Sequence, residues 1–331
     1  MGLPTMMNID AKLLTESNLT NSILFAPSMQ EADKIGILSG YPTPNMASWY
    51  LKALEEKQVS LKVNLLVGMI PSDGLSTDIH EGFCKLHRAL PPEIHSTFEC
   101  EYVTRLPSFH GNIYVFLKED RPLCAFGGSA PFNQSSFVYP SRQEIMFQYD
   151  ARTAWDEFQK IEATSIYCTH SEIEEYVRIT KESSVFDSMN KTPLEKDSGL
   201  ERVVLSLLSS KGKIGAKSGL NWGHREGRNQ NQAYIPIPKK VSVSGFFPND
   251  GRHITVHTDD NKVLVMRTEQ QRNKALTTPL SNAELGEYFR YRLGLGNGDF
   301  VREEDLAKYG RTDVEFIKYD DETYFMNFAS R

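Results

Sequence analysis

One stretch decides the fold of the first half of the chain: Ser108-Phe109-His110-Gly111-Asn112-Ile113-Tyr114-Val115-Phe116. Two segments follow it, Gly127-Gly128-Ser129-Ala130-Pro131-Phe132-Asn133 and Gln143-Glu144-Ile145. Apolar and β-branched residues bounded by turn residues predict three consecutive strands here, over 109–118, 123–127 and 144–149. Because side chains alternate along a strand, His110 and Asn112 are expected on one face of the first strand.

The flanking sequence alternates between strand and helix patterns. Strand patterns cover 34–41, 61–69 and 96–104, and amphipathic helix patterns cover 46–57 and 76–90. Asp150 is an expected N-cap for a further helix that runs to about Tyr167. This order of elements predicts an α/β fold for the N-terminal half.

The second half has a different pattern. A polar stretch, 178–198, has the composition of a linker, and it predicts a domain over 1–180, a linker over 181–199 and a second domain over 200–331. Short strands are expected at 233–237, 253–258 and 262–267, with one helix at 282–293. The C-terminal domain is therefore expected to be mainly β.

Charge is unevenly distributed along the chain of 331 residues, whose net charge is -6. Between Lys211 and Lys240 the only acid is Glu226, and from Asp299 onward acids outnumber bases. Seven bases accompany Glu226: Lys211, Lys213, Lys217, Arg225, Arg228, Lys239 and Lys240. A cationic stretch of this kind favours a polyanionic partner, although the net charge argues against nonspecific coating of nucleic acid.

The cysteines indicate neither a zinc site nor a disulfide framework. Four are present, Cys84, Cys100, Cys124 and Cys168, and they form no CxxC pair. No apolar run reaches the 18 residues of a membrane span, and the first 25 residues lack the apolar core of a signal peptide. We therefore expect a cytoplasmic protein with no membrane contact, no metal and no cofactor.

The three opening segments resemble the phospholipase-D nuclease motif. In that family one strand carries His-x-Lys, the next ends in Gly-Ser-x-Asn, and a Glu follows on a third. The resemblance implies a phospholipase-D-like domain whose nucleophile is a histidine, which attacks phosphorus without a metal. The residues of this chain that match or nearly match are His110, Asn112, Ser129, Asn133 and Glu144.

The chain departs from that motif at two positions. Asn112 replaces the Lys, and Pro131 stands at the Asn position, two residues before Asn133. An amide gives hydrogen bonds but no positive charge to the phosphorane, so Lys118 or Arg142 would have to supply a cation. Since family sites need two histidine motifs and this chain has one, the resemblance also implies a homodimer with the site on its two-fold axis.

Residues 218–238 resemble the C-terminal region of the NgoFVII group of restriction endonucleases, which also carries the phospholipase-D half. The resemblance implies a B3-like pseudobarrel that grips double-stranded DNA with two arms, here Lys217–Gln232 and Met266–Lys274. Arg, Asn, Gln and His side chains suit base-edge contacts, and Lys suits phosphate. The expected DNA contacts are Lys211, Lys213, Lys217, Ser218, Asn221, His224, Arg225, Arg228, Gln230, Asn231, Gln232, Arg267, Gln270, Gln271, Arg272, Asn273 and Lys274.

Other functions stay open at this point. A sequence-specific DNA-binding protein with an inactive nuclease domain fits the replaced Lys, and a phospholipase fits the motif but lacks an evident lipid-docking surface. Glu55-Glu56-Lys57 supplies the Glu-x-Lys of metal-dependent nucleases, without an Asp-bearing strand before it. Lys211–Ser218 lacks the glycines of a phosphate loop, so any ATP requirement would fall to a separate ATPase or helicase subunit.

Overall fold

The computed structural model describes residues 12–14, 18–29, 31–180, 199–209 and 212–330. The chain divides into two compact units, 1–183 and 184–331. Nearly all of the expected linker, 181–199, lies outside the described residues, so its bounds stay a prediction.

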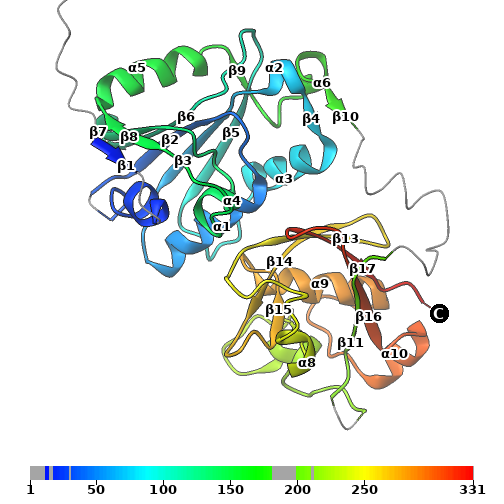
Figure 1. Ribbon diagram of the computed structural model, residues 1–331. Helices are drawn as coiled ribbons and strands as arrows, with labels where there is room; N and C mark the ends of the chain where they lie inside the picture. The colour runs from blue at the N-terminus through cyan, green and yellow to red at the C-terminus, as the bar shows by residue number, and fades with distance from the viewer. Residues whose placement is uncertain (1–11, 15–17, 30, 181–198, 210–211, 331) are drawn as a thin grey trace, which may run out of the picture. The chain divides into compact units, whose positions relative to one another are not determined.

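The N-terminal unit is built on a mixed sheet (Figure 1). Its strand order in the described residues is β1-β8-β7-β6-β2-β3-β5-β9, and β2, β3 and β5 run parallel. The strands are β1 Lys12–Leu14, β2 Lys34–Ser39, β3 Lys62–Val67, β5 Thr97–Val103, β6 Asn112–Lys118, β7 Arg121–Gly128, β8 Met146–Tyr149 and β9 Ser165–Tyr167. A separate parallel pair joins β4 Leu75–Ser76 to β10 Ile179–Thr180.

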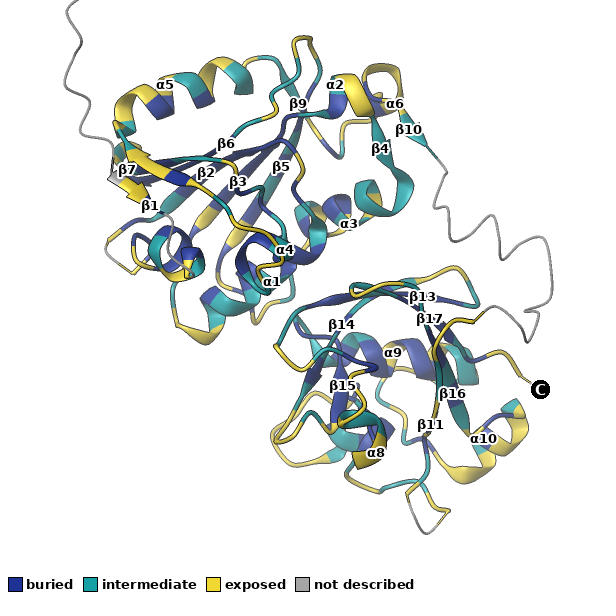
Figure 2. Ribbon diagram, in the orientation of Figure 1, coloured by how far each residue is buried: buried dark blue, intermediate teal, exposed yellow. Residues whose placement is uncertain are grey.

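Helices cover both faces of this sheet. Figure 1 shows α5 on one face and α1 and α3 on the other, and Figure 2 shows that their buried sides face the strands. The α1 helix begins where the Thr43 side chain accepts the Met46 N–H at 3.3 Å, with Pro44 at its first position. The helices are η1 Thr20–Phe25, α1 Pro44–Glu56, α2 Ile70–Asp73, α3 Thr77–Arg88, α4 Gln134–Phe137, α5 Ala151–Glu162 and α6 Ile173–Tyr176.

Several expected elements have different bounds in the structure. The strand expected over 144–149 begins at Met146, so Glu144 precedes it. The strand expected over 109–118 begins at Asn112, so His110 lies in the loop before β6 and not on the strand. The helix expected to reach Tyr167 ends at Glu162, and Ser165–Tyr167 pairs with β5 instead. That pairing joins residues more than 60 positions apart in the chain, for example Val103 with Ser165, and no local sequence pattern predicts it.

The C-terminal unit is a strongly curved sheet whose two end strands, β11 and β12, contact each other, which gives a nearly closed barrel. Its order in the described residues is β11-β16-β17-β13-β14-β15-β12. The strands are β11 Arg202–Ser206, β12 Ile235–Pro236, β13 Ile254–Thr258, β14 Val263–Glu269, β15 Ala275–Thr277, β16 Asp313–Lys318 and β17 Thr323–Asn327. The barrel encloses a core rich in Leu, Ile and Phe.

The expected helix is found as α9 Asn282–Leu293, and it ends at Gly294, whose φ of 70° is left-handed. The sequence did not predict α10 Glu303–Tyr309, which begins with three acids, as helix N-termini favour, and ends at the left-handed Gly310. Two short helices, η2 Gly219–His224 and α8 Lys239–Ser242, complete the unit as described.

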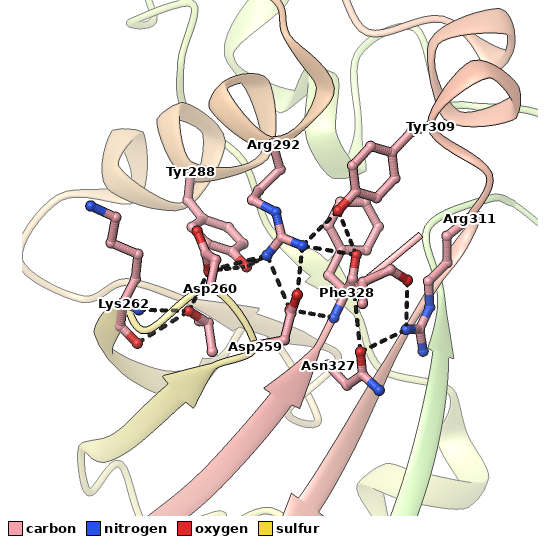
Figure 3. Close-up of polar contacts among 11 residues, drawn as sticks. Asp259, Asp260, Lys262, Tyr288, Arg292, Tyr309, Arg311, Asn327 and Phe328 are labelled. Carbon is pink, nitrogen blue, oxygen red and sulfur yellow. Dashed lines mark hydrogen bonds and ion pairs between the residues drawn. The ribbon is translucent and has the colours of Figure 1, made fainter. Parts of the chain in front are cut away.

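Arg292 ties three parts of this unit together (Figure 3). Its guanidinium donates to the two Asp259 carboxylate oxygens at 3.0 and 2.6 Å and to the hydroxyls of Tyr288 and Tyr309 at 2.7 and 2.6 Å. It also donates to the Phe328 carbonyl at 3.2 Å. Because only 9% of the Arg292 side chain is exposed, the helix α9, the β13–β14 turn and the segment after β17 share one largely desolvated charge cluster.

Candidate active site and nucleic-acid interface

One edge of the N-terminal sheet collects the candidate catalytic residues. Four neighbouring strands align there, because Ser39 pairs with Asn112, Asn112 with Gly128, and Gly128 with Met146. His110 precedes Asn112 in the chain, Ser129 follows Gly128, and Glu144 precedes Met146. Residues from three separate loops therefore lie at the same edge of the sheet.

Close backbone contacts fix the loop that carries His110. The Gly40 N–H donates to the Gly111 carbonyl at 3.1 Å, and the Phe109 N–H donates to the Gly68 carbonyl at 3.1 Å. A Cβ at position 40 would lie 2.7 Å from the His110 carbonyl oxygen, and one at position 68 would lie 2.2 Å from the Phe109 carbonyl oxygen. Only glycine permits these approaches, which hold the exposed His110 side chain beyond the ends of β2 and β3.

Glu144 is held by two serines. Ser129 Oγ donates to Glu144 Oε2 at 2.5 Å, and Ser136 Oγ donates to Glu144 Oε1 at 3.1 Å. Ser129 Oγ also accepts the Ile145 N–H at 2.9 Å. Both carboxylate oxygens therefore have a hydroxyl donor, and the side chain is fixed beside the end of β7.

Asn112 is buried, and its amide is fully used within the unit. Its Oδ1 accepts from Ser39 Oγ at 2.7 Å, and its Nδ2 donates to the carbonyls of Gly128 and Ser129 at 3.2 and 3.1 Å. With 5% of the residue exposed, these bonds leave the amide no free donor for a phosphate. We therefore revise its expected role from contact with the phosphate to support of the β6–β7 edge.

Asn133 and the two candidate cations have distinct placements. The Asn133 side chain caps α4 by accepting the Ser136 N–H at 3.0 Å. Lys118 is at the far end of β6 from Asn112 and pairs with Asp33 at 3.5 Å, so it is too remote to replace the family's Lys. Arg142, by contrast, is exposed two residues before Glu144.

Sequence reasoning missed two residues at this edge. Ser39 Oγ, besides its bond to Asn112, accepts the Phe132 N–H at 3.0 Å and so links β2 to the segment after β7. The Tyr41 ring lies edge-on to His110, with centroids 5.6 Å apart. The sequence feature that could have identified these two residues is Ser39-Gly40-Tyr41 at the end of an apolar strand. In α/β sheets, binding residues gather at this end of the strands.

In the C-terminal unit the first arm, Lys217–Gln232, has a buried base and an exposed tip. Asn221 is fully buried, where its amide accepts the Val301 N–H at 2.9 Å and donates to the Val301 carbonyl at 2.8 Å. Asn231 is 8% exposed, and it accepts the Gly298 N–H at 2.7 Å and donates to Glu287 at 3.2 Å. These two residues hold the arm, so we remove them from the expected DNA contacts.

Arg290, a buried arginine of α9, anchors the same arm. Its guanidinium donates to the carbonyls of Leu220 and Gln230 at 3.4 and 3.1 Å, and to those of Asp299 and Gly286 at 2.8 and 3.2 Å. Burial lowers the pKa of this guanidinium. One side chain thus joins both ends of the arm to α9.

The exposed tip of the arm, 225–230, presents two arginines in different settings. The Arg228 guanidinium lies 4.1 Å from the centroid of the Trp222 ring and donates to Gln232 Oε1 at 2.9 Å. Within the described residues, the Arg225 side chain makes one hydrogen bond, from Nε to the Lys217 carbonyl at 2.8 Å. Arg228 is therefore held by an aromatic face and an amide, whereas Arg225 is tethered by one bond.

The remaining expected contacts of the first arm and of the segment before it differ in exposure. Lys213, Lys217 and Gln230 are exposed, and Ser218 is half-buried at the start of η2. His224 packs 5.1 Å from the Phe300 ring. Lys211 lies outside the described residues.

The second arm, Met266–Lys274, has its exposed tip at the β14–β15 hairpin. Gln270, Gln271, Arg272 and Lys274 are exposed and Asn273 is half-buried. Gln270, Arg272 and Asn273 have left-handed φ values of 67, 66 and 52°. Arg267 is on β14, where its Nε donates to Glu269 at 2.8 Å, so the tip and not the strand offers free side-chain donors.

The described residues hold no group of three or more His, Cys, Asp or Glu side chains placed to bind a metal ion. They also include no helix that is long and apolar enough to cross a membrane.

Two family models match the chain. One, the NgoFVII restriction endonuclease N-terminal PLD domain, matches residues 17–175, and the other, the NgoFVII C-terminal B3-like DNA-binding domain, matches residues 195–320. Fold and site thus define a phospholipase-D-type nuclease domain joined to a B3-like DNA-binding domain, which confirms the expected fold classes. The chain belongs to the NgoFVII restriction endonuclease family.

Solved structures also resemble parts of the chain. NucT from Helicobacter pylori is 13% identical with a TM-score of 0.34, over 48% of this chain and 99% of its own. Nuc from Salmonella typhimurium, a phospholipase D family member, is 10% identical with a TM-score of 0.34, over 48% of this chain and 97% of its own. A hypothetical Arabidopsis thaliana protein is 12% identical with a TM-score of 0.23, over 41% and 98%. No curated protein matches the chain.

Proposed function

We propose that the chain cleaves double-stranded DNA at specific sites, with His110 as a metal-independent nucleophile in a site that two copies of the chain assemble. The observation that carries the proposal is the exposed His110 side chain, on a loop whose backbone is fixed at the sheet edge that also holds Glu144. The other domain of the chain is of a DNA-binding family. The cytoplasm is the proposed compartment, which agrees with four unpaired cysteines.

The proposed chemistry has two displacements. A nitrogen of neutral imidazole attacks phosphorus, a P–N bond forms, and the P–O bond to the leaving deoxyribose oxygen breaks. The second copy's imidazole, in its protonated form, gives its proton to that oxygen and becomes neutral. It then accepts a proton from a water molecule, whose oxygen attacks phosphorus as the P–N bond to His110 breaks. We assign the missing positive charge to Arg142, because it is exposed beside Glu144 and Asn112 has no free donor.

Chelation tests the metal-free mechanism. Plasmid DNA that contains the recognition site should be cut equally fast in excess EDTA and in magnesium, because no step requires a Lewis acid. The readout is the rate of conversion from supercoiled to linear DNA on a gel. Loss of cleavage in EDTA with recovery on adding magnesium would refute this mechanism.

We place the contact between the two copies next to Glu144. Three large apolar side chains are exposed there on neighbouring segments: Leu13 (52%), Ile145 (46%) and Phe147 (42%). Leu13 pairs with Phe147 across β1 and β8, so these two form one patch. A second copy is the occupant we propose, since a single histidine motif leaves the site incomplete and the patch adjoins it.

Phe147→Asp is expected to convert the dimer to monomers, because the interface would have to bury an unpaired carboxylate. Cleavage should fall in parallel, whereas DNA binding by the C-terminal domain persists. Sedimentation velocity and plasmid cleavage measure the two effects. Leu123→Asp, at an exposed residue of β7, is the control. A dimeric, active Phe147→Asp variant would refute this interface.

DNA reading is assigned to the tips of the two arms. Arg228→Ala is expected to weaken binding to the recognition sequence by about 1–3 kcal/mol while nonspecific binding changes little, because an oriented guanidinium fork suits a guanine edge. Arg225→Ala, the matched control, should weaken both kinds of binding similarly and reduce the salt slope by about 1. Fluorescence anisotropy over a salt series measures both. Equal behaviour of the two variants contradicts this division of roles.

A second candidate function is recognition of DNA without cleavage. The locked amide of Asn112 at the family's Lys position favours it. It predicts specific binding with no cleavage in either EDTA or magnesium.

We also propose a separate ATPase or helicase subunit as a partner. If cleavage requires such a subunit, its addition together with ATP should start cleavage by a chain that does not cut DNA alone.

A further inference from the structure

Tyr41 is an exposed aromatic residue beside the proposed nucleophile, and it belongs to no part of the nuclease motif. It follows β2 by two positions, and 46% of it is exposed. Its ring stands nearly perpendicular to the His110 imidazole, with an interplanar angle of 82° and centroids 5.6 Å apart. Edge-to-face is one of the two arrangements that aromatic pairs favour, the other being offset stacking.

The ring of Tyr41 is held from its far end. The Tyr41 hydroxyl donates to Asp73 Oδ2 at 2.7 Å, and the Asp73 backbone carbonyl accepts from Arg178 Nη2 at 2.8 Å. The hydrogen bond to Asp73 favours the protonated phenol and so raises the pKa of Tyr41. An exposed tyrosine would otherwise sample several rotamers, whereas this one is tied to the short helix α2.

His110 is constrained at its backbone but much less at its ring. Gly40 and Gly68 fix the backbone of its loop. Across the described part of the chain, the contact with Tyr41 is the one interaction of the imidazole itself, and Glu144 directs its oxygens to Ser129 and Ser136. The direction of the attacking nitrogen therefore depends on the Tyr41 ring.

We propose that Tyr41 is a positioning residue: held by Asp73, its ring limits rotation of the His110 imidazole and keeps one ring nitrogen directed at the phosphodiester. The role rests on the proposed nuclease function. Tyr41 need not touch the reacting atoms, and its effect is exerted through the orientation of His110, since an attacking group must lie close to its reactive geometry.

The test compares Tyr41→Ala and Tyr41→Phe with wild type in two measurements on the full chain. Steady-state cleavage should show kcat about tenfold lower in Tyr41→Ala with KM unchanged, and a smaller loss in Tyr41→Phe, which keeps the ring but not the bond to Asp73. Carbon-13 relaxation of the His110 ring, assigned by its absence in His110→Ala, should show a lower order parameter in Tyr41→Ala.

Tyr176→Ala is the matched control. Tyr176 is 52% exposed and stands edge-on to His170, with centroids 6.1 Å apart, so it repeats the geometry at a different histidine. This variant should cleave like wild type and leave the His110 ring order unchanged.

The two measurements separate the inference from the proposed function. A His110 ring that stays equally ordered in Tyr41→Ala overturns the positioning role, whatever the cleavage rate. A mobile ring with unchanged kcat also overturns it. If no variant cleaves, wild type included, but the ring loses order only in Tyr41→Ala, the positioning of His110 stands and the nuclease proposal fails.

Discussion

His110→Ala is expected to reduce DNA cleavage by more than about 10⁴-fold, because removal of a nucleophile that forms a covalent intermediate abolishes both displacements. Binding to the recognition sequence should not change, since the side chain is exposed and contributes nothing to the core of its unit. Single-turnover cleavage with saturating enzyme measures the rate, and anisotropy measures binding.

His95→Ala controls for loss of an exposed histidine. His95 is paired with Glu55 at 2.9 Å, and 70% of its side chain is exposed. It should cleave at the wild-type rate. A His110→Ala variant that retains more than about a hundredth of wild-type activity would exclude His110 as a nucleophile and leave it at most a general acid–base role.

Restoring the family's lysine at position 112 is a poor test of the nuclease. Asn112→Lys would remove hydrogen bonds to Ser39 and to two carbonyls of the neighbouring strand end, and it would place an ammonium where 5% of the present residue is exposed. Loss of activity in that variant could arise from distortion of the sheet edge at β6 and β7, and it would not distinguish this from a change in the reaction. Substitution of the exposed Arg142 by Ala tests the missing cation without this cost.

Arg292→Ala is expected to destabilise the C-terminal unit by about 3 kcal/mol, because it leaves the Asp259 carboxylate without its cation in a largely desolvated cluster. Arg292→Lys should recover only part of the loss, since one ammonium cannot replace the two-pronged bond to Asp259 together with both tyrosine hydroxyls. Hydrogen exchange of the slowest β17 amides measures the free energy of unfolding of this unit separately.

Lys308→Ala removes an exposed cation from the neighbouring helix α10 and is the control. Its effect should stay within about 0.5 kcal/mol. A loss below about 1 kcal/mol in Arg292→Ala would show that the cluster is solvated in solution, as exposed ion pairs are.

The elements predicted best carry their own start and stop signals. Thr43 and Pro44 begin α1, and Gly294 follows the last residue of α9. For these helices the spacing of apolar residues and the capping residues predict the same bounds. The strand expected from residue 109 starts at Asn112, because Gly40 and Gly68 draw the preceding loop onto other strands. Those approaches join positions about 40 to 70 residues apart, and a local window does not report them.

In the candidate site, too, residue type and order could be predicted from the sequence, whereas contacts between distant residues could not. The types and order of His110, Ser129 and Glu144 suffice to place them at one edge once the strands are paired. Polar type alone misassigned Asn221 to the DNA contacts, since its amide serves the backbone of Val301, 80 residues away. A polar side chain in a polar loop looks the same in sequence whether it faces solvent or satisfies a buried peptide group.

The buried Arg290 has a consequence for the thermodynamics of recognition. Since its guanidinium already holds the carbonyls of Leu220 and Gln230, the first arm is fixed in shape before any contact. If this arm reads DNA as we propose, little conformational entropy is lost on association. A loop that folded on contact would instead show a large unfavourable entropy balanced by enthalpy. On that proposal the arm is ordered once, during folding, and binding at each DNA site would not require it to be ordered again.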